Sequence, residues 1–262
     1  LFGPEDPADE NSFAGAVGFS DARLLLFPIK SVHGVFAYAT CPRALAQLQR
    51  DWSYLKSEEI PGLAEVVGAV SEEDQVLVAN NSILKIDDNQ VMLEEYAYTI
   101  VHNKEAEEDL GEFGKWLMEN VFTGDNKAFE YFMHKFTDSL VVLPDNSFKD
   151  FVELSTEVIT RTKIDNDTGT VADGALFTEE YLPSDSLLYS LIFLAPEFGK
   201  VNDNGQPANG KRDLEKIREE FTGNLPEYFQ LGANASLGKG MIRTSFTNHN
   251  ANSDTNDKNV TQ

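Results

Sequence analysis

The sequence predicts an α+β protein in which helical insertions interrupt a small antiparallel sheet. Strand-like and helix-like segments alternate irregularly along the 262 residues, and no βαβ unit repeats at a fixed period. Hydrophobic residues make up 41% of the chain, so there is enough apolar surface to bury a core. A strand–turn–strand pattern over residues 157–182 adds one long hairpin. These observations together favour an α+β fold over a repeating α/β fold.

The N-terminal part is expected to contain strands followed by one helix. Apolar runs predict three strands, the first two of them buried, at residues 16–22, 24–29 and 35–39. The helix is expected to begin near Pro42, whose ring fits a first turn, with Thr40 or Cys41 as its cap. Leu45 and Leu48 form its buried face. Cys41 is predicted to be a small core residue, because no histidine or acid beside it in the sequence would activate a thiol.

The central part is predicted to contain both strands and helices. The strands are expected at residues 75–79, 91–100 and 140–143, with a turn at residues 87–89. Helices are expected over residues 106–122, from Asp125 onward, and over residues 147–156 with Asp145 as a cap. The second helix carries an aromatic stripe that is typical of a core rather than of a cofactor site, made of Phe129, Phe132, Met133 and Phe136. His134 lies off this stripe and is predicted to be a surface residue.

The hairpin at residues 157–182 has the clearest local pattern of the chain. Apolar and polar residues alternate along its first strand, residues 157–164, and residues 175–182 form the returning strand. Its polar tip is rich in turn-forming residues, from Asp165 to Gly169 and again at Asp173-Gly174. A hairpin this long has few ways to bury its tip. It is therefore expected to reach another chain or a nucleic acid, although an ordinary surface hairpin has the same local pattern.

The C-terminal part is expected to form smaller elements and a tail. Residues 186–194 are predicted to form an apolar strand, and residues 199–210 a loop. A helix over residues 211–221 follows, with Leu214, Ile217 and Phe221 facing inward, and then a strand at residues 228–231. Residues 248–262 form a polar tail rich in asparagine and aspartate, which is expected to be disordered.

Composition excludes two classes of protein. No apolar run approaches the about 18 residues of a membrane span, and a single cysteine excludes an internal disulfide framework. A cytoplasmic location without a membrane partner is therefore expected. The net charge of −23 counts against nucleic-acid binding, because phosphates are neutralised by basic residues. RNA binding then requires a local basic groove on a protein whose net charge is negative.

Three separated motifs carry a family resemblance. The hairpin reads TEVITRTKID at residues 156–165 and TGTVADGALFTEEYLP at residues 168–183. FSDARLLLFPIKSVHGVFAYATCP stands at residues 19–42, and LGANASLGKGMIR at residues 231–243. In these motifs and their order the chain resembles the RAMP-family backbone subunits of type III-B CRISPR–Cas (Cmr) effector complexes. The resemblance implies a modified ferredoxin-like (RRM-like) palm with helical insertions as a single RAMP domain over residues 1–247, and a hairpin thumb at about residues 157–183.

The resemblance also implies partners and a chemistry. Such subunits bind crRNA, form a helical filament with further copies of themselves and with other type III-B subunits, and cut target RNA with a divalent metal, Mg²⁺ or Mn²⁺. The loop with the main catalytic aspartate is expected upstream of Leu1, so the chain is expected to lack its N-terminal segment. Its own endoribonuclease activity is therefore left open. Asp21 does not replace that aspartate and is expected to pair with Arg23 or with a backbone amide.

Two residues of the thumb motif match positions implicated in the family's cleavage site. These are Glu179 and Tyr181. Their expected role is to orient groups or handle protons beside the scissile phosphate, because cleavage requires an activated and aligned 2′-hydroxyl. An ordinary sheet aromatic is an equally good interpretation of Tyr181.

RNA contacts are expected from three places that match the family's motifs. The end of a buried strand is expected to contact the guide backbone, and a glycine loop allows backbone N–H groups to approach phosphates closely. The thumb is expected to neutralise phosphates at its base and to wedge apolar side chains between guide and target. A solvated charged strand face is the alternative for the basic residues. The expected contacts are Lys30, Ser31, His33, Arg161, Lys163, Thr168, Val171, Leu176, Phe177, Gly238, Lys239 and Gly240.

Two functions follow from these observations. The first is a guide-RNA-binding backbone subunit of a type III-B antiviral complex, which takes part in cleavage of target RNA. The second is an acidic, non-catalytic scaffold or assembly protein with a RAMP-like fold that does not bind RNA by itself. The net charge and the expected missing segment favour the second function, whereas the three motifs favour the first.

Overall fold

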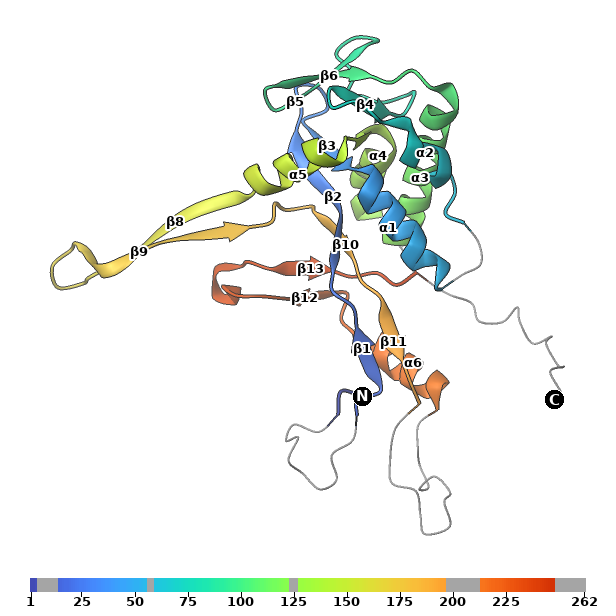
Figure 1. Ribbon diagram of the computed structural model, residues 1–262. Helices are drawn as coiled ribbons and strands as arrows, with labels where there is room; N and C mark the ends of the chain where they lie inside the picture. Colours follow the sequence, from blue (N-terminus) through green and yellow to red (C-terminus); the bar gives the residue numbers. More distant parts are fainter. Residues whose placement is uncertain (4–13, 56–58, 123–126, 197–212, 248–262) are drawn as a thin grey trace, which may run out of the picture. The chain divides into compact units, whose positions relative to one another are not determined.

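A computed structural model describes residues 1–3, 14–55, 59–122, 127–196 and 213–247 (Figure 1). The chain divides into two compact units. The larger unit comprises Val17–Met118 and Ala128–Phe193, and the smaller one comprises Leu1–Ala16, Glu119–Lys127 and Leu194–Gln262. The predicted loop at residues 199–210 and the tail at residues 248–262 lie outside the described residues. None of the helices in the described ranges is long and apolar enough to cross a membrane.

The centre of the larger unit is a seven-stranded sheet with the order β10-β2-β3-β7-β4-β6-β5. Its strands are β2 (Arg23–Lys30), β3 (Phe36–Thr40), β4 (Gln75–Val78), β5 (Gln90–Leu93), β6 (Tyr96–Ile100), β7 (Leu140–Val142) and β10 (Leu187–Tyr189). The pairs β3–β7 and β4–β6 are parallel, and the other pairs are antiparallel. The sheet is therefore larger than predicted, and it is mixed rather than antiparallel.

Helices cover this sheet because strand side chains alternate between its faces. They are α1 (Pro42–Ser53), α2 (Leu63–Ala69), α3 (Lys104–Val121), α4 (Glu130–Asp138) and α5 (Asp145–Leu154), with a short 3₁₀ turn η1 (Lys127–Phe129) before α4. Phe27 and Ile29 of β2 belong to one buried cluster with Phe148 and Phe151 of α5. Tyr38 of β3 instead stacks on Phe136 of α4, with 4.8 Å between the ring centroids.

Several local predictions for the larger unit are confirmed. Helix α1 begins at Pro42 after Cys41, and Leu45, Leu48 and the Cys41 thiol are buried. His134 is exposed on α4. Of the aromatic stripe, Phe136 is buried, and the remaining residues Phe129, Phe132 and Met133 are half-buried.

Three boundaries in the larger unit differ from the prediction. Residues 91–100 form two strands rather than one, because the chain reverses at Glu94, where φ is 52°. Residues 186–194 likewise divide into β10 and β11 (Ile192–Leu194), and β11 pairs with the short, largely exposed β1 (Val17–Phe19). The carboxylate of Asp145 accepts a hydrogen bond from the backbone N–H of Arg43 at 2.9 Å, so it caps α1, and α5 begins after Pro144.

The hairpin forms from β8 (Glu157–Ile164) and β9 (Val171–Tyr181), which pair antiparallel. In Figure 1 it extends from the end of α5, away from the sheet of the same unit. The first strand has the predicted bounds, but the second begins at Val171 rather than at residue 175. Asp173-Gly174 therefore lies in β9 and not in the tip. The register is continuous from Glu157↔Tyr181 to Thr162↔Leu176 and shifts before Ile164↔Val171.

The smaller unit contains α6 (Leu214–Asn224), a 3₁₀ turn η2 (Ala235–Leu237), and the antiparallel pair β12 (Tyr228–Gln230) and β13 (Met241–Arg243). Ile217 and Phe221 of α6 are buried as predicted, whereas Leu214, the first residue of the helix, is exposed. Arg243 donates from Nε to Glu227 at 2.9 Å and from Nη1 to the carbonyl of Val121 at 3.2 Å. These bonds join β13 to the end of α3 within this unit.

Candidate nucleic-acid interface

The base of the hairpin brings together Arg161, Glu179 and Tyr181. In the observed register Ile159 lies opposite Glu179, and side chains two residues apart share a face of the hairpin. Arg161 forms an ion pair through Nε with Glu179, and its Nη2 donates to the Tyr181 hydroxyl at 3.2 Å. That hydroxyl in turn donates to Oε2 of Glu179 at 2.7 Å. The three side chains thus form a closed polar cluster.

This cluster changes the role that Arg161 can play. Its side chain is only 25% exposed, and the hydrogen bond to Tyr181 together with the charge of Glu179 raises the pKa of the guanidinium. Because a carboxylate within the protein already compensates the charge, Arg161 has less charge to offer to a phosphate than the sequence implied. Its geometry is that of a residue that orients Glu179 and Tyr181. The Tyr181 hydroxyl takes part in this cluster, so the side chain is more than an apolar filler of the sheet.

Lys163 is an exposed cation near the tip end of β8, next to Ile164, and not at the base where the sequence had placed it. It lies between Thr162 and Ile164, where the register of the two strands shifts. A register irregularity of this kind re-aims the side chains that it carries. Lys163 is therefore better placed than Arg161 for contact with a phosphate.

The tip of the hairpin is organised by Asp165. Its carboxylate accepts hydrogen bonds from the backbone N–H groups of Thr168 and Asp167, both at 2.9 Å, and from the Thr168 hydroxyl at 3.1 Å. The backbone bonds, that of Thr168 first, lower the pKa of Asp165. The Thr168 hydroxyl also lies 2.9 Å from that of Thr170. Thr168 thus shapes the turn, and its hydroxyl is already engaged.

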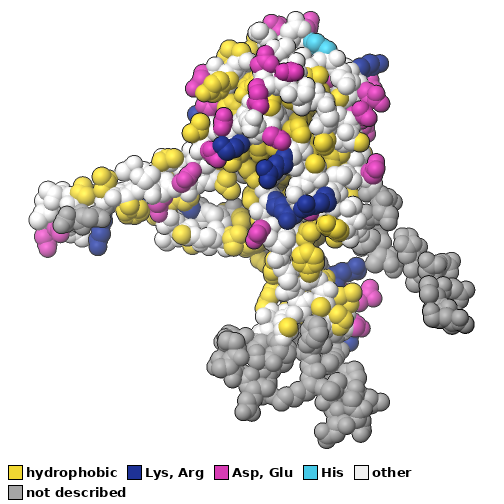
Figure 2. All heavy atoms as spheres, in the orientation of Figure 1, with side chains coloured by type: hydrophobic (Ala, Val, Ile, Leu, Met, Phe, Trp, Pro, Cys, Tyr) yellow, Lys and Arg dark blue, Asp and Glu magenta, His cyan; other side chains and the backbone are white. Residues whose placement is uncertain are grey.

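The hairpin exposes apolar side chains from Phe177, which lies opposite Arg161, to Val171 beside the tip. Val171, Leu176 and Phe177 are 49%, 66% and 50% exposed, as a wedge requires. Ile164, 51% exposed and directly opposite Val171, is a further exposed apolar residue of the hairpin that was missing from the predicted contacts. The alternation of residues 157–164 could have identified it. Figure 2 shows apolar side chains along this hairpin.

The loop after β2 presents Lys30, Ser31 and His33, of which Lys30 and His33 are exposed. The carbonyl of Lys30 accepts from the N–H of Glu94 at 2.9 Å, and the Ser31 hydroxyl donates to the carbonyl of Met92 at 3.2 Å. Nδ1 of His33 lies 2.8 Å from the carbonyl of Lys85, a geometry that requires the proton on Nδ1. The loop is therefore hydrogen-bonded to β5 and to the segments before and after it. In His33 only Nδ1 takes part in the bond to Lys85, and Nε2 does not.

The glycine loop of the smaller unit has a different structure from the expected phosphate cradle. The N–H of Gly238 donates to the carbonyl of Ala235 at 3.0 Å, and that of Lys239 to the carbonyl of Asn234 at 3.3 Å. These two amides are bound within the loop, which corrects the expectation that they approach phosphates. Gly240 has φ 72°, and a Cβ there would lie 2.0 Å from the carbonyl oxygen of Leu231, so only glycine fits this close approach.

Asp21 does not pair with Arg23. Arg23 forms an ion pair with Asp51, which is buried and also accepts from the Tyr189 hydroxyl at 2.8 Å and from the Gln47 amide at 3.0 Å. Burial opposes ionisation, but these hydrogen bonds and the charge of Arg23 together lower the pKa of Asp51. The network connects α1 to β2 and to β10, the strand that follows the hairpin, and sequence spacing had not indicated it.

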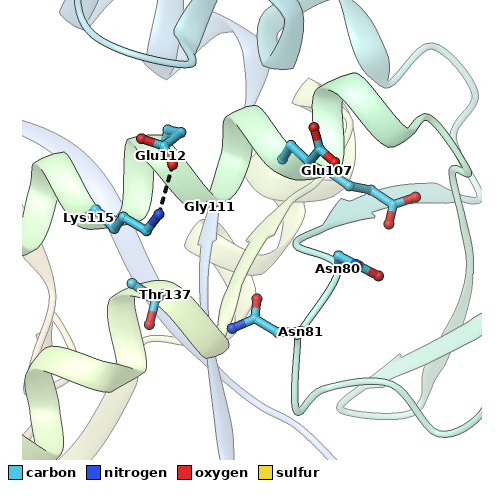
Figure 3. Close-up of a pocket in the computed structure, with 8 residues that line it drawn as sticks. Asn80, Asn81, Glu107, Gly111, Glu112, Lys115 and Thr137 are labelled. Atoms are coloured by element: carbon cyan, nitrogen blue, oxygen red, sulfur yellow. Dashed lines mark hydrogen bonds and ion pairs between the residues drawn. The ribbon is translucent and has the colours of Figure 1, made fainter.

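A pocket of about 330 Å³ lies elsewhere in the larger unit, between α3, α4 and the loop after β4 (Figure 3). It is lined by Asn80, Asn81, Glu107, Glu108, Gly111, Glu112, Lys115 and Thr137. Lys115 is paired with Glu112 at 2.7 Å. Its acidic lining does not suit a phosphate group, and it contains no predicted site residue.

The larger unit has basic surface, but its described residues contain no cluster of metal ligands. Figure 2 shows Lys and Arg side chains gathered in the larger unit between the hairpin base and α1, so basic surface exists despite the net charge of −23. Among the described residues, no three His, Cys, Asp or Glu side chains are grouped closely enough to hold a metal ion. The described residues thus offer no cluster of three such ligands for the divalent metal that the resemblance implies.

Comparison with known proteins identifies the family. The RAMP superfamily profile matches residues 1–243. The Cmr endoribonuclease Cmr4 of Pyrococcus furiosus is 34% identical over 248 residues, which cover 94% of this chain and 74% of that protein. The CMR subunit Cmr4 of Saccharolobus solfataricus is 25% identical over 252 residues, 92% of this chain and 75% of its own length.

Solved structures agree with the sequence comparison. Oligomeric Cmr4 from Pyrococcus furiosus superimposes with a TM-score of 0.61 at 29% identity, over 87% of this chain and 72% of that chain. A chain of the type III-B Cmr-beta complex bound to cognate target RNA has the same fold, with a TM-score of 0.57 at 19% identity over 90% of this chain and 72% of its own. The chain therefore belongs to the RAMP superfamily and is a homologue of Cmr4, the type III-B Cmr subunit, as its three motifs predicted.

Proposed function

We propose that the chain is a guide-RNA-binding backbone subunit of a type III-B CRISPR effector complex and takes part in cleavage of target RNA. The observation that carries this proposal is the 34% identity to a Cmr endoribonuclease over 94% of the chain. Its partners are crRNA, target RNA, other Cmr subunits and further copies of itself, with which it forms a helical filament on the guide. An oligomeric structure of a relative supports the last partner. The acidic scaffold is favoured by the net charge and by the expected missing segment, whereas the sequence identity favours the backbone subunit.

The cluster at the hairpin base supports a role in alignment. Glu179 is held on two sides, by its ion pair with Arg161 and by a hydrogen bond from the Tyr181 hydroxyl. In the proposed function Arg161 holds Glu179 and the Tyr181 hydroxyl in place, so that these groups orient the 2′-hydroxyl or the phosphate of the scissile nucleotide.

The distal hairpin supports the wedge. A wedge unstacks bases with apolar side chains, and Ile164, Val171 and Leu176 expose such side chains along the hairpin. The tip itself is shaped by the bonds to Asp165, which form without RNA. In the proposed function it separates guide and target into short segments, and Lys163, next to Ile164, neutralises a phosphate.

The divalent metal belongs to the proposal only as a requirement of cleavage. We assign it no position, because the described residues offer no ligand cluster. Cleavage of target RNA with Mg²⁺, with Mn²⁺ and with a chelator tests this requirement directly. A cytoplasmic location, where guide RNAs are found, is likewise part of the proposal.

The RNA content of the protein purified from its native host tests the function as a whole. Short RNAs that share a 5′ repeat-derived tag are the expected result, measured by absorbance ratio and RNA sequencing. Protein free of RNA, purified at low salt together with its partners, would instead favour the acidic scaffold. Low salt matters because phosphate contacts are lost as salt rises.

A further inference from the structure

The loop after β2 contains a strained turn at Val35. Its φ is 73°, and the N–H of Phe36 donates to the carbonyl of Gly34 at 2.9 Å, so Val35 is the central residue of a three-residue turn. This is the rarer and strained of the two γ-turn types. A β-branched residue at positive φ is an outlier, because its side chain crowds the backbone. The Val35 side chain is 75% exposed, so its own packing does not hold the turn in place.

Lys135 of α4 contacts this turn from inside the protein. The residue is 5% exposed, and its Nζ donates to the carbonyl of Gly34 at 2.6 Å, across 101 residues of sequence. The ammonium also lies 5.3 Å from the ring centroid of Phe36 and 5.8 Å from that of Tyr131. The Gly34 carbonyl thus accepts from two donors, and one of them is a buried cation.

A buried ammonium is costly unless its protons are bound. Burial lowers the pKa of Lys135, and the charge of Asp138 opposes this shift. An apolar side chain of similar volume would fill the same space without that cost. The cation therefore contributes something that packing alone does not, and its shortest contact is with the strained turn.

We propose that Lys135 is a positioning residue that holds the loop of residues 31–35 in the shape in which it binds RNA. This inference rests on the proposed function, in which Lys30, Ser31 and His33 contact the guide backbone. Lys135 does not itself reach the RNA. It fixes the Gly34 carbonyl, as the Met92 and Lys85 carbonyls fix Ser31 and His33, and so reduces the ordering that binding would otherwise require.

The first test measures RNA affinity as a function of salt. The full chain is titrated with a fluorescein-labelled single-stranded RNA that carries a repeat-derived 5′ tag. Lys135→Met is expected to weaken binding about tenfold through lost preorganisation, with the slope of log K against log salt unchanged. Lys30→Ala is expected to weaken binding and to lower the slope. Lys149→Met, which removes an exposed lysine of α5, is the control of equal charge change.

A double variant separates positioning from a general loss of structure. Asparagine adopts positive φ more readily than valine and does not add the conformational freedom of glycine, so Val35→Asn relieves the strain of the turn. Addition of Val35→Asn to Lys135→Met is expected to restore part of the affinity. Unchanged affinity of Lys135→Met, or no rescue by Val35→Asn, would overturn the inference.

The second test does not involve RNA. Hydrogen exchange of the Ser31 and Phe36 amides, which are bonded across the turn, is expected to become at least tenfold faster in Lys135→Met than in Lys149→Met. Equal exchange rates in the two variants would show that Lys135 does not hold the turn in place, whether or not the wild type binds RNA. If the wild-type protein does not bind RNA, the proposed function is contradicted, and with it the role of Lys135 in RNA binding. Faster exchange in Lys135→Met would in that case still establish that Lys135 holds the Gly34 carbonyl.

Discussion

Arg161 and Tyr181 meet across the hairpin, with Nη2 of the arginine 3.2 Å from the tyrosine hydroxyl. They are 20 residues apart in the sequence, and the antiparallel register of β8 and β9 brings them to one face. Glu179 completes the contact by pairing with both. Arg161, which the sequence had assigned to phosphate contact, therefore acts as one unit with Glu179 and Tyr181, which the resemblance had assigned to the cleavage site.

The two basic residues of the first hairpin strand, Arg161 and Lys163, are predicted to differ in salt dependence. Lys163→Ala should lower the slope of log K against log salt by about 0.7, the value for one phosphate contact with a single strand. The double variant Arg161→Met/Glu179→Gln removes both charges of the ion pair and should keep the wild-type slope. Fluorescence anisotropy at several salt concentrations measures both. Equal losses of slope would mean that the ion pair opens when RNA binds.

The Tyr181 hydroxyl is predicted to affect cleavage more than binding. Tyr181→Phe keeps the ring but leaves Glu179 with one donor fewer, so single-turnover cleavage of target RNA by the assembled complex should slow about tenfold or more. Guide binding should be unchanged. Tyr96→Phe, on the exposed part of β6, is the control, since its ring contact with Phe151 is retained. Full activity of Tyr181→Phe would return Tyr181 to the status of a sheet aromatic.

The exposed apolar surface of the hairpin is predicted to matter for function and not for stability. Ile164→Ser and Val171→Ser should each change the free energy of unfolding by less than about 0.5 kcal/mol, because neither side chain is buried. Target cleavage by the assembled complex should fall in both. Leu154→Ser, which alters an even more exposed apolar residue outside the hairpin, in α5, should leave both quantities unchanged. A large drop in stability would show that these residues pack against another part of the protein.

Cys41 is predicted to be unreactive in the folded protein. Burial raises the pKa of its thiol to about 12. At pH 8 only about one thiol in ten thousand is then ionised, and the thiolate is the reactive form. Alkylation by iodoacetamide, followed by mass spectrometry, should be slow without denaturant and rapid in urea. Rapid labelling of the folded protein would mean that the start of α1 opens readily.

The ionised carboxylate of Asp51 is predicted to stabilise the folded protein at pH values above its pKa. Its pKa is lower in the folded protein than in the unfolded chain, so its contribution is present above the unfolded value near 4 and is lost as the pH falls through the folded value. Asp51→Asn should lower the free energy of unfolding by about 2 kcal/mol at pH 7, through weaker bonds to Arg23 and Tyr189. The difference between variant and wild type should shrink in acid, as measured by urea unfolding at several pH values. A constant difference would contradict the assignment.

The local structure was predictable where its cause is local. The bounds of β8 follow from the alternation of residues 157–164, and the start of α1 follows from Pro42 in a first turn. The burial of Cys41 follows from its position beside that start. Helix α2 was missed, and so was the division of residues 91–100, where the turn uses a glutamate, Glu94, rather than a glycine or an asparagine.

Distant partners were not predictable from any local pattern. Asp145 has the spacing of a cap for α5, yet its carboxylate binds the N–H of Arg43, 102 residues away. The sheet is mixed because β3 pairs in parallel with β7, and β4 pairs in parallel with β6. Which strands become neighbours depends on how the chain crosses over between them. The amides of Gly238 and Lys239 bond inside their own loop, although a glycine-rich sequence is equally compatible with amides that face outward.

By itself, the sequence determined the hairpin, the α+β class and, through three motifs, the family, because each depends on neighbouring residues or on their order. Only the tertiary structure decided that Arg161 pairs with Glu179 and that Lys135 supports the turn at Val35. Both contacts depend on which strand or helix faces which. That choice is made by burial of the whole core, and no short stretch of sequence contains it.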